Sequence, residues 1–203
     1  MNVALIGATG NVGSRLLAEL LGRGHQVTGI ARDISTLPSR PGLHARSGDA
    51  NRQAQLTPLL AGHDAVLSAL KFATTDAASV IAAVKQAGVA RLLVVGGAGT
   101  LEVAPGKALI DTPEFPAAWK PEAEGGRTFL ARLRAERELD WTFLSPSADF
   151  APGERTGRFR LGGDQLLVDA EGKSRVSMED FAIALVDELE HPKHSRRRFT
   201  VGY

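Results

Sequence analysis

Three glycines near the start of the chain have the spacing of a phosphate-binding turn. Gly7, Gly10 and Gly13 directly follow the apolar run Val3–Ile6, and a helical apolar period begins at Val12. The first glycine permits a tight strand-to-helix turn, the second lets the backbone approach a diphosphate, and the third lets the helix lie close to the strand. The free N–H groups of the first helical turn would then bind the phosphates. A tight turn that has lost its ligand is the structural alternative.

The end of the second apolar run bears on which dinucleotide would bind there. Val27–Ala31 is followed by Arg32 and Asp33. A carboxylate at this place binds the adenosine ribose and favours NAD, whereas an arginine favours the additional phosphate of NADP. The planar guanidinium of Arg32 can bind a phosphate through two parallel hydrogen bonds. The sequence therefore predicts NADP(H), with NAD(H) left open by Asp33, and Arg15 could add a second positive charge.

The elements that would position these residues alternate between strands and helices. Apolar runs that predict strands lie at 3–6, 27–31, 43–45, 64–70, 89–95, 141–144, 166–168 and 199–201. Periodic stretches that predict helices lie at 12–21, 52–60, 76–87, 122–138 and 178–190, with Ser177 as the N-cap of the last. This alternation predicts an α/β fold with a Rossmann-type, doubly wound parallel sheet.

The second half of the chain predicts loops on the substrate side of that sheet. Residues 97–121 contain four prolines and no clear periodicity, and residues 145–175 are rich in glycine and basic side chains. Long irregular segments in a compact domain are more often binding loops than linkers. We therefore expect one domain over residues 1–203, with a small C-terminal extension on the substrate side.

Composition narrows the classes of function. Lys and Arg total 24 against 23 Asp and Glu, so the net charge of +1 gives no electrostatic reason to expect a nucleic-acid partner. There is no apolar stretch of about 18 residues and no signal peptide, so we expect a cytoplasmic protein without membrane contact. The chain has no cysteine and no His-Glu-x-x-His motif, and we predict no metal site.

Segments spread over nearly the whole chain match the motifs of one superfamily. They are Gly7–Gly13, Ile30–Arg32, Gly48-Asp49, Ser68–Leu70, Val94–Gly99, Trp141–Pro146 and Val176–Ala182. Through them the chain resembles the NAD(P)-binding atypical short-chain dehydrogenase/reductases, and within these the NmrA-like group of small NADH–flavin reductases and biliverdin/flavin reductases. These motifs are specific for cofactor binding and much less specific for a substrate.

The resemblance places a set of residues around the cofactor. The opening turn would contribute Gly7, Thr9, Gly10, Asn11, Val12 and Gly13. Asp49 matches an acidic residue that contacts the adenine amino group, although Gly-Asp-Ala-Asn is also an ordinary turn sequence. Ser68-Ala69-Leu70 would line the crevice near the ribose, because ligands of open α/β sheets lie at the carboxyl ends of strands. Gly96 and Gly97 would leave room and free N–H groups at the nicotinamide.

Catalytic residues are harder to find, because the Tyr-x-x-x-Lys pair of typical members is absent. The one tyrosine, Tyr203, is the last residue. The five histidines fit structural roles in turns and loops: His25, His44, His63, His191 and His194. Ser147 and Thr100 remain as candidates for a polar contact or proton relay at the substrate. Two basic segments, 155–160 and 196–198, are predicted to be solvated. The alternative is a site for a flavin phosphate at 155–160 and a partner surface at 196–198.

The absence of the Tyr-x-x-x-Lys acid limits which hydride acceptors the chain could reduce. An oxidised flavin accepts hydride without a strong protein acid, because the cofactor and solvent manage the proton. We predict an NAD(P)H-dependent oxidoreductase that transfers hydride to a flavin, as a substrate rather than a bound prosthetic group, or to a quinone-like acceptor. The alternatives are an NmrA-like redox sensor that binds NADP without turnover, and an NAD(P)-dependent epimerase. We expect a monomer or homodimer.

Overall fold

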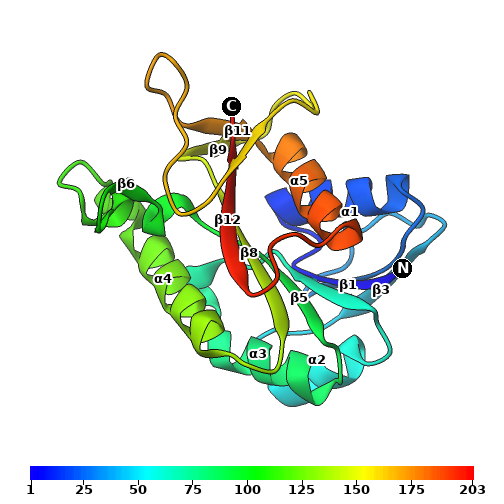
Figure 1. The fold of residues 1–203 in the computed structure, drawn as a ribbon. Helices are drawn as coiled ribbons and strands as arrows, with labels where there is room; N and C mark the ends of the chain where they lie inside the picture. The colour runs from blue at the N-terminus through cyan, green and yellow to red at the C-terminus, as the bar shows by residue number, and fades with distance from the viewer.

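The apolar runs assemble into one eight-stranded sheet in a computed structural model that describes residues 1–203 (Figure 1). Its strands are β1 (Asn2–Ile6), β2 (Gln26–Ala31), β3 (Leu43–Ser47), β4 (Ala65–Ser68), β5 (Arg91–Val95), β8 (Asp140–Pro146), β10 (Arg160–Gly162) and β12 (Arg197–Gly202). The spatial order is β10-β12-β8-β5-β4-β1-β2-β3, and every neighbouring pair is parallel except β10 with β12. This order reverses beside β1, as in Rossmann folds, and confirms the predicted fold class.

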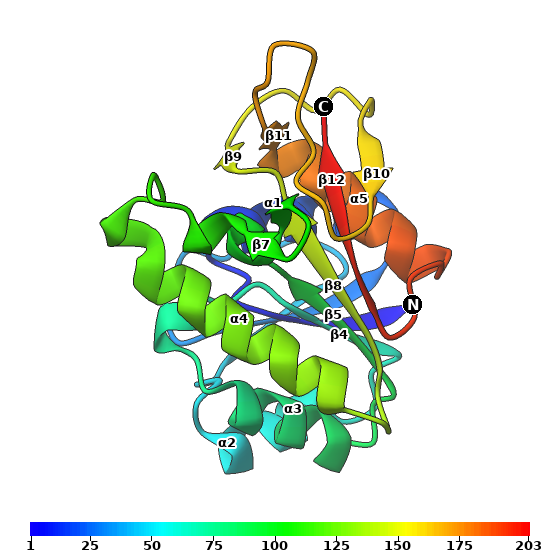
Figure 2. The ribbon, with the colours of Figure 1, turned by 60° about the vertical axis from the view of Figure 1, so that its left-hand side comes forward.

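Five α-helices cover the two faces of the sheet (Figure 2). They are α1 (Asn11–Gly22) and α5 (Met178–Glu190) on one face, and α2 (Gln53–Leu60), α3 (Ala77–Gln86) and α4 (Lys120–Ala135) on the other. Buried side chains form two clusters of 22 and 21 residues, one on each face. The strands between them are buried on both sides, which is why they read as continuous apolar runs. None of these helices has the length and apolar character needed to cross a membrane.

Local sequence explains where these helices begin. The Ser177 hydroxyl accepts a hydrogen bond from the N–H of Asp180 (3.0 Å), and α5 has the predicted bounds. Asp76 caps α3 by accepting from the N–H of Ala78 (3.0 Å). Helix α1 differs, because glycine is its N-cap residue and no side chain caps it.

The substrate-side segments contain short strands that the sequence did not indicate. β9 (Asp149–Ala151) pairs with β11 (Arg175–Ser177), and β6 (Glu102–Ala104) forms a hairpin with β7 (Lys107–Ala108) beside α4 (Figures 1 and 2). The strand predicted over residues 166–168 is not formed. Instead, the N–H of Leu166 donates to the carbonyl of Glu102 (2.9 Å) next to an isolated bridge at Gln165.

Candidate dinucleotide-binding site

Two of the three glycines of the opening turn, Gly7 and Gly13, lie where no side chain would fit. Gly7 has φ = +84°, and its N–H donates to the carbonyl of Ile30 (2.8 Å). A Cβ atom on Gly7 would lie 2.4 Å from the carbonyl oxygen of Ala69, and a Cβ on Gly13 would lie 2.0 Å from that of Gly7. The turn, the start of α1 and the end of β4 are therefore in backbone contact, which only glycine permits.

The same turn presents backbone donors to its surroundings. Ser14 makes the first bond of α1, to the carbonyl of Gly10 (2.9 Å), so the N–H groups of Asn11, Val12 and Gly13 have no acceptor within the helix. Thr9, Gly10 and Asn11 are exposed. An uncapped and open helix N-terminus of this kind favours an anionic ligand, since its free N–H groups and dipole carry partial positive charge.

Arg32 lies exposed at the end of β2 and has no ion pair or side-chain hydrogen bond. Its neighbour Asp33 does not neutralise it. The Asp33 carboxylate accepts the N–H of Ser35 (2.9 Å), and this hydrogen bond lowers the pKa of Asp33. Arg15 is less available, because its Nε donates to Glu179 on α5 (3.0 Å). Of the two predicted cations, Arg32 is the one left without a protein partner.

Asp49 lies in a structured turn after β3. Its Oδ1 accepts the N–H of Asn51 (3.0 Å). The side chain of Asn51 donates to the carbonyl of Thr74 (2.7 Å) and accepts from the N–H of Asp76 (2.9 Å), which ties this turn to the start of α3. Asp49 is half-buried and keeps Oδ2 at 3.8 Å from the Nε of Arg52. The turn is thus rigid with or without a contact to adenine.

The end of β4 is held by a residue that the sequence did not reveal. Ser68 is buried, and Ala69 and Leu70 are half-buried next to the opening turn. The carboxylate of Glu122 on α4 accepts the N–H groups of Phe72 (2.8 Å) and Ala73 (2.9 Å) in the following 3-10 turn, η1 (Phe72–Thr74). Only its place near the start of a polar helix distinguished Glu122 from other surface carboxylates, so sequence reasoning passed over it.

The two glycines after β5 have different surroundings. Gly96 is buried, its N–H donates to the carbonyl of Leu144 (2.7 Å), and a Cβ there would lie 2.4 Å from the ring of Phe143. The expectation of a free N–H and open space at Gly96 is therefore wrong. Gly97 does leave space, since the nearest atom to an added Cβ is 3.9 Å away on Phe72.

The two hydroxyls proposed for catalysis are both engaged within the protein. Ser147 is fully buried, and its Oγ donates to the carbonyl of Val201 on β12 (3.1 Å). Thr100, in the 3-10 turn η2 (Ala98–Thr100), accepts a hydrogen bond from Arg198 near the start of β12 (3.2 Å). Because Ser147 is buried next to β12, the strand that pairs with β8, and Thr100 is bonded to Arg198, we assign neither hydroxyl a contact with substrate.

The one tyrosine is also engaged. The Tyr203 hydroxyl accepts the N–H of Ser177 (3.2 Å) and donates to the buried carboxylate of Asp180 (2.8 Å). These partners belong to the start of α5. Tyr203 therefore fastens the C-terminus to this helix and is not free to act as an acid over the nicotinamide.

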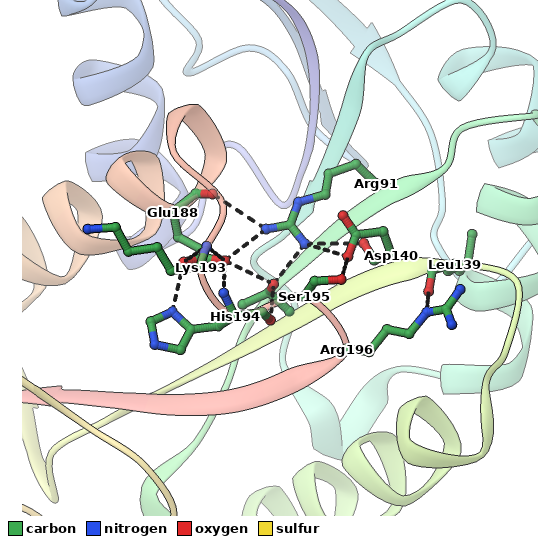
Figure 3. A network of polar contacts seen from close by, with 9 residues as sticks. Arg91, Leu139, Asp140, Glu188, Lys193, His194, Ser195 and Arg196 are labelled. Carbon is green, nitrogen blue, oxygen red and sulfur yellow. Dashed lines mark hydrogen bonds and ion pairs between the residues drawn. The ribbon is translucent and has the colours of Figure 1, made fainter.

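Three of the histidines belong to polar networks at the amino ends of the strands. His194 bonds through Nδ1 to Glu188 (2.8 Å), which also pairs with Arg91 (3.2 Å) at the start of β5 (Figure 3). His25 bonds to Glu190 (2.8 Å), and His63 bonds to Thr28 (2.8 Å). All three have structural partners, at the opposite end of the sheet from the glycine turn.

A family model described as NAD(P)H-binding matches residues 7–192. The chain belongs to the NAD(P)H-binding family. The matched range begins at the first glycine of the turn and extends just past the end of α5, so it includes every residue proposed for the dinucleotide site.

Solved structures of similar sequence share the whole fold but differ in their descriptions. A "putative exported protein" of Burkholderia pseudomallei is 45% identical (TM-score 0.91), with 100% of each chain covered. A "putative epimerase" of Bacteroides thetaiotaomicron is 43% identical (TM-score 0.95), covering 100% of this chain and 96% of that one. A "putative NADH-flavin reductase" of Streptococcus pneumoniae is 34% identical (TM-score 0.87), with 100% and 99% covered. The descriptions agree on no single reaction.

Proposed function

We propose that this member of the NAD(P)H-binding family is an NADPH-dependent reductase that transfers hydride to a flavin or a similar planar, quinone-like acceptor. The observation that carries the proposal is the opening turn of Gly7, Gly10 and Gly13 with Arg32, an arginine without a protein partner, at the end of the neighbouring strand β2. The space that a Cβ on Gly7 or Gly13 would fill is occupied by backbone. Thr9, Gly10 and Asn11, at the open side of this packed backbone, are exposed, so a diphosphate can approach the free N–H donors of α1 closely.

Arg32 supports NADPH over NADH. It is exposed at the end of β2, where the 2′ group of the adenosine would lie, and no protein carboxylate competes for it. The carboxylate that follows it in sequence, Asp33, accepts the N–H of Ser35 and forms no ion pair with Arg32. A free guanidinium can form two parallel hydrogen bonds with a phosphate, whereas it gains little from a neutral ribose hydroxyl.

We infer the class of hydride acceptor from the groups around the expected position of the nicotinamide, at the ends of β4 and β5. The backbone of Phe72 and Ala73, fixed by Glu122, and the open position at Gly97 would orient the nicotinamide without supplying an acid. When bound, NADPH supplies a hydride; the acceptor takes up two electrons and draws its proton from solvent. A flavin or quinone tolerates this arrangement, whereas a ketone or an epimerisation needs a positioned acid or base.

Anaerobic mixing of the protein, NADPH and flavin mononucleotide tests the proposal. We expect the absorbances of the dihydronicotinamide and the oxidised flavin to fall together, one for one, and faster than in the protein-free mixture. NADPH binding with no oxidation by flavins or quinones would contradict the reductase and favour a sensor. Inversion of configuration at one carbon of a sugar nucleotide, with no net oxidation of NADPH, would favour an epimerase.

A further inference from the structure

A hollow of about 500 Å³ lies on the edge of the molecule away from the glycine turn. It is bounded by the last turn of α4, the start of β8, the segment after β10 and the start of β12. We call it the arginine hollow, after the polar and aromatic residues that line it: Arg134, Trp141, Asp164, Arg196, Arg197 and Arg198. Neither the cofactor site nor the proposed reaction uses these residues.

The charge of the arginine hollow is strongly unbalanced, with four arginines and one carboxylate. Asp164 is already taken, because it pairs with the buried Arg198, whose Nε lies 2.6 Å from Asp164 Oδ1. The same Oδ1 lies 3.4 Å from Arg134. One carboxylate therefore serves two guanidinium groups, and the remaining positive charge has no protein counterion.

Two further arginines have donors that the protein leaves unused. Arg197 is exposed and makes no side-chain hydrogen bond or ion pair. The one side-chain hydrogen bond of Arg196 is from its Nε to the carbonyl of Leu139 (3.2 Å). Its two terminal guanidinium nitrogens have no hydrogen-bond partner (Figure 3). A hollow lined by four arginines and one carboxylate favours an anionic ligand on electrostatic grounds.

Two independent features of the same place indicate that its geometry is specified. Arg196 is the only non-glycine residue with positive φ (+52°), a conformation that is sparsely populated and found mostly where function or tight packing requires it. The indole Nε1 of Trp141 in the wall is buried without a hydrogen-bond partner. Because this atom is closed to solvent, it is not a ligand for an anion in the hollow, but the indole lies in the wall and can report binding there.

We propose that the arginine hollow is a binding site for a small multivalent oxyanion, with Arg134, Arg196 and Arg197 as its principal ligands. The chemical class is a metabolite that carries several phosphate or carboxylate groups, since both match the planar fork of a guanidinium. The inference is independent of the dinucleotide, because the hollow begins at the amino end of β8 whereas the glycine turn follows the carboxyl end of β1.

Trp141 provides a local readout. The chain has two tryptophans, and Trp119 is 64% exposed at the start of α4, so Trp119→Phe leaves Trp141 as the sole indole. We would titrate this protein with inorganic pyrophosphate, and in a separate arm with citrate, at constant ionic strength. The fluorescence and the indole ¹H–¹⁵N resonance of Trp141 would be followed. A saturable change is expected, with the tighter of the two anions identifying phosphate or carboxylate as the preferred group.

Exposed arginines supply the matched variants. Arg134→Gln combined with Arg197→Gln should weaken binding by about tenfold or more, since hydrogen bonds to charged groups are involved. Arg158→Gln removes an exposed arginine of another loop and should leave binding unchanged. No saturable change with either anion, or an equal change in the double variant, would overturn the proposal.

Discussion

At the scale of single residues, the glycine turn is specified by backbone contacts rather than by flexibility. A Cβ on Gly13 would lie 2.0 Å from the carbonyl oxygen of Gly7, whereas a Cβ on Gly22, the last residue of the same helix, would meet nothing within 4 Å. The spacing of the glycines predicted this close approach. Sequence patterns could not predict that Ser147 is buried, because its partner Val201 on β12 lies more than fifty residues later in the chain.

Gly13→Ala is expected to lower the free energy of unfolding by about 1–3 kcal/mol, as in other overpacked sites. It should also weaken NADPH binding by about tenfold or more, since the helix must move away from the diphosphate. Gly22→Ala is the matched control and should stabilise the protein by up to about 1 kcal/mol, as glycine-to-alanine changes in helices normally do. Denaturant unfolding and NADPH titration of both variants measure this. Equal effects of the two changes would contradict the packing assignment.

Arg32→Gln tests the cofactor preference. The change removes a charge-assisted interaction with the 2′-phosphate, so NADPH affinity should fall by roughly 10- to 100-fold. NADH affinity should change little, because NADH has no phosphate at that position. Arg40→Gln, which removes an exposed arginine a few residues farther along, should affect neither nucleotide. Equal losses for NADPH and NADH would show that Arg32 does not read the phosphate.

At the scale of elements, three carboxylates fix the loop after β9 to the helices α1 and α5. Arg155 pairs with Glu19 (2.9 Å), the N–H of Gly153 donates to Glu179 (2.8 Å), and the N–H of Gly157 donates to Asp180 (2.8 Å). Local patterns predicted α5 and its Ser177 cap. They could not predict β9, β10 or β11, since each has three residues and exists only through pairing with a distant segment.

These contacts predict a dependence of stability on pH. Burial disfavours the charged form of Glu19, but its ion pairs with Arg155 and Arg23 outweigh burial and lower its pKa. A carboxyl whose pKa is lower in the folded state stabilises the protein above its ordinary pKa of about 4.3 and loses that contribution as pH falls through the folded pKa. The free energy of unfolding should therefore decrease as the pH falls below about 4.5.

Glu19→Gln removes this contribution. Its unfolding free energy, measured at a series of pH values, should decline less steeply in the acid range than that of the unchanged protein. Glu171→Gln, at an exposed glutamate without a side-chain partner, serves as the control and should follow the unchanged protein. Parallel curves for Glu19→Gln and the unchanged protein would contradict the assignment.

At the scale of the whole molecule, the C-terminal residues join the sheet to the substrate-side segment 145–175 and to α5. β12 lies between β8 and β10, and Tyr203 at its end contacts Asp180 and Ser177 on the α5 side. The alternation of apolar runs predicted the parallel sheet. The hydrogen bonds of Tyr203 to Ser177 and Asp180 were not predicted, because no sequence pattern marks this single residue and its partners come together only in the folded chain.

Tyr203→Phe separates structure from catalysis. It leaves buried Asp180 with one partner fewer and should lower the free energy of unfolding by about 1–3 kcal/mol. The rate of flavin reduction per folded molecule should be retained, because the hydroxyl takes no part in the proposed hydride transfer. Thermal unfolding and steady-state NADPH oxidation measure the two effects. Full stability with abolished turnover would make Tyr203 an acid after all.

A crystal structure of the protein with NADPH tests most directly whether the opening turn binds the diphosphate of a reduced dinucleotide. We expect the diphosphate against the N–H groups of Asn11, Val12 and Gly13, and the 2′-phosphate at Arg32. Clear density for NADPH elsewhere, with the turn closed by a protein side chain, would contradict it.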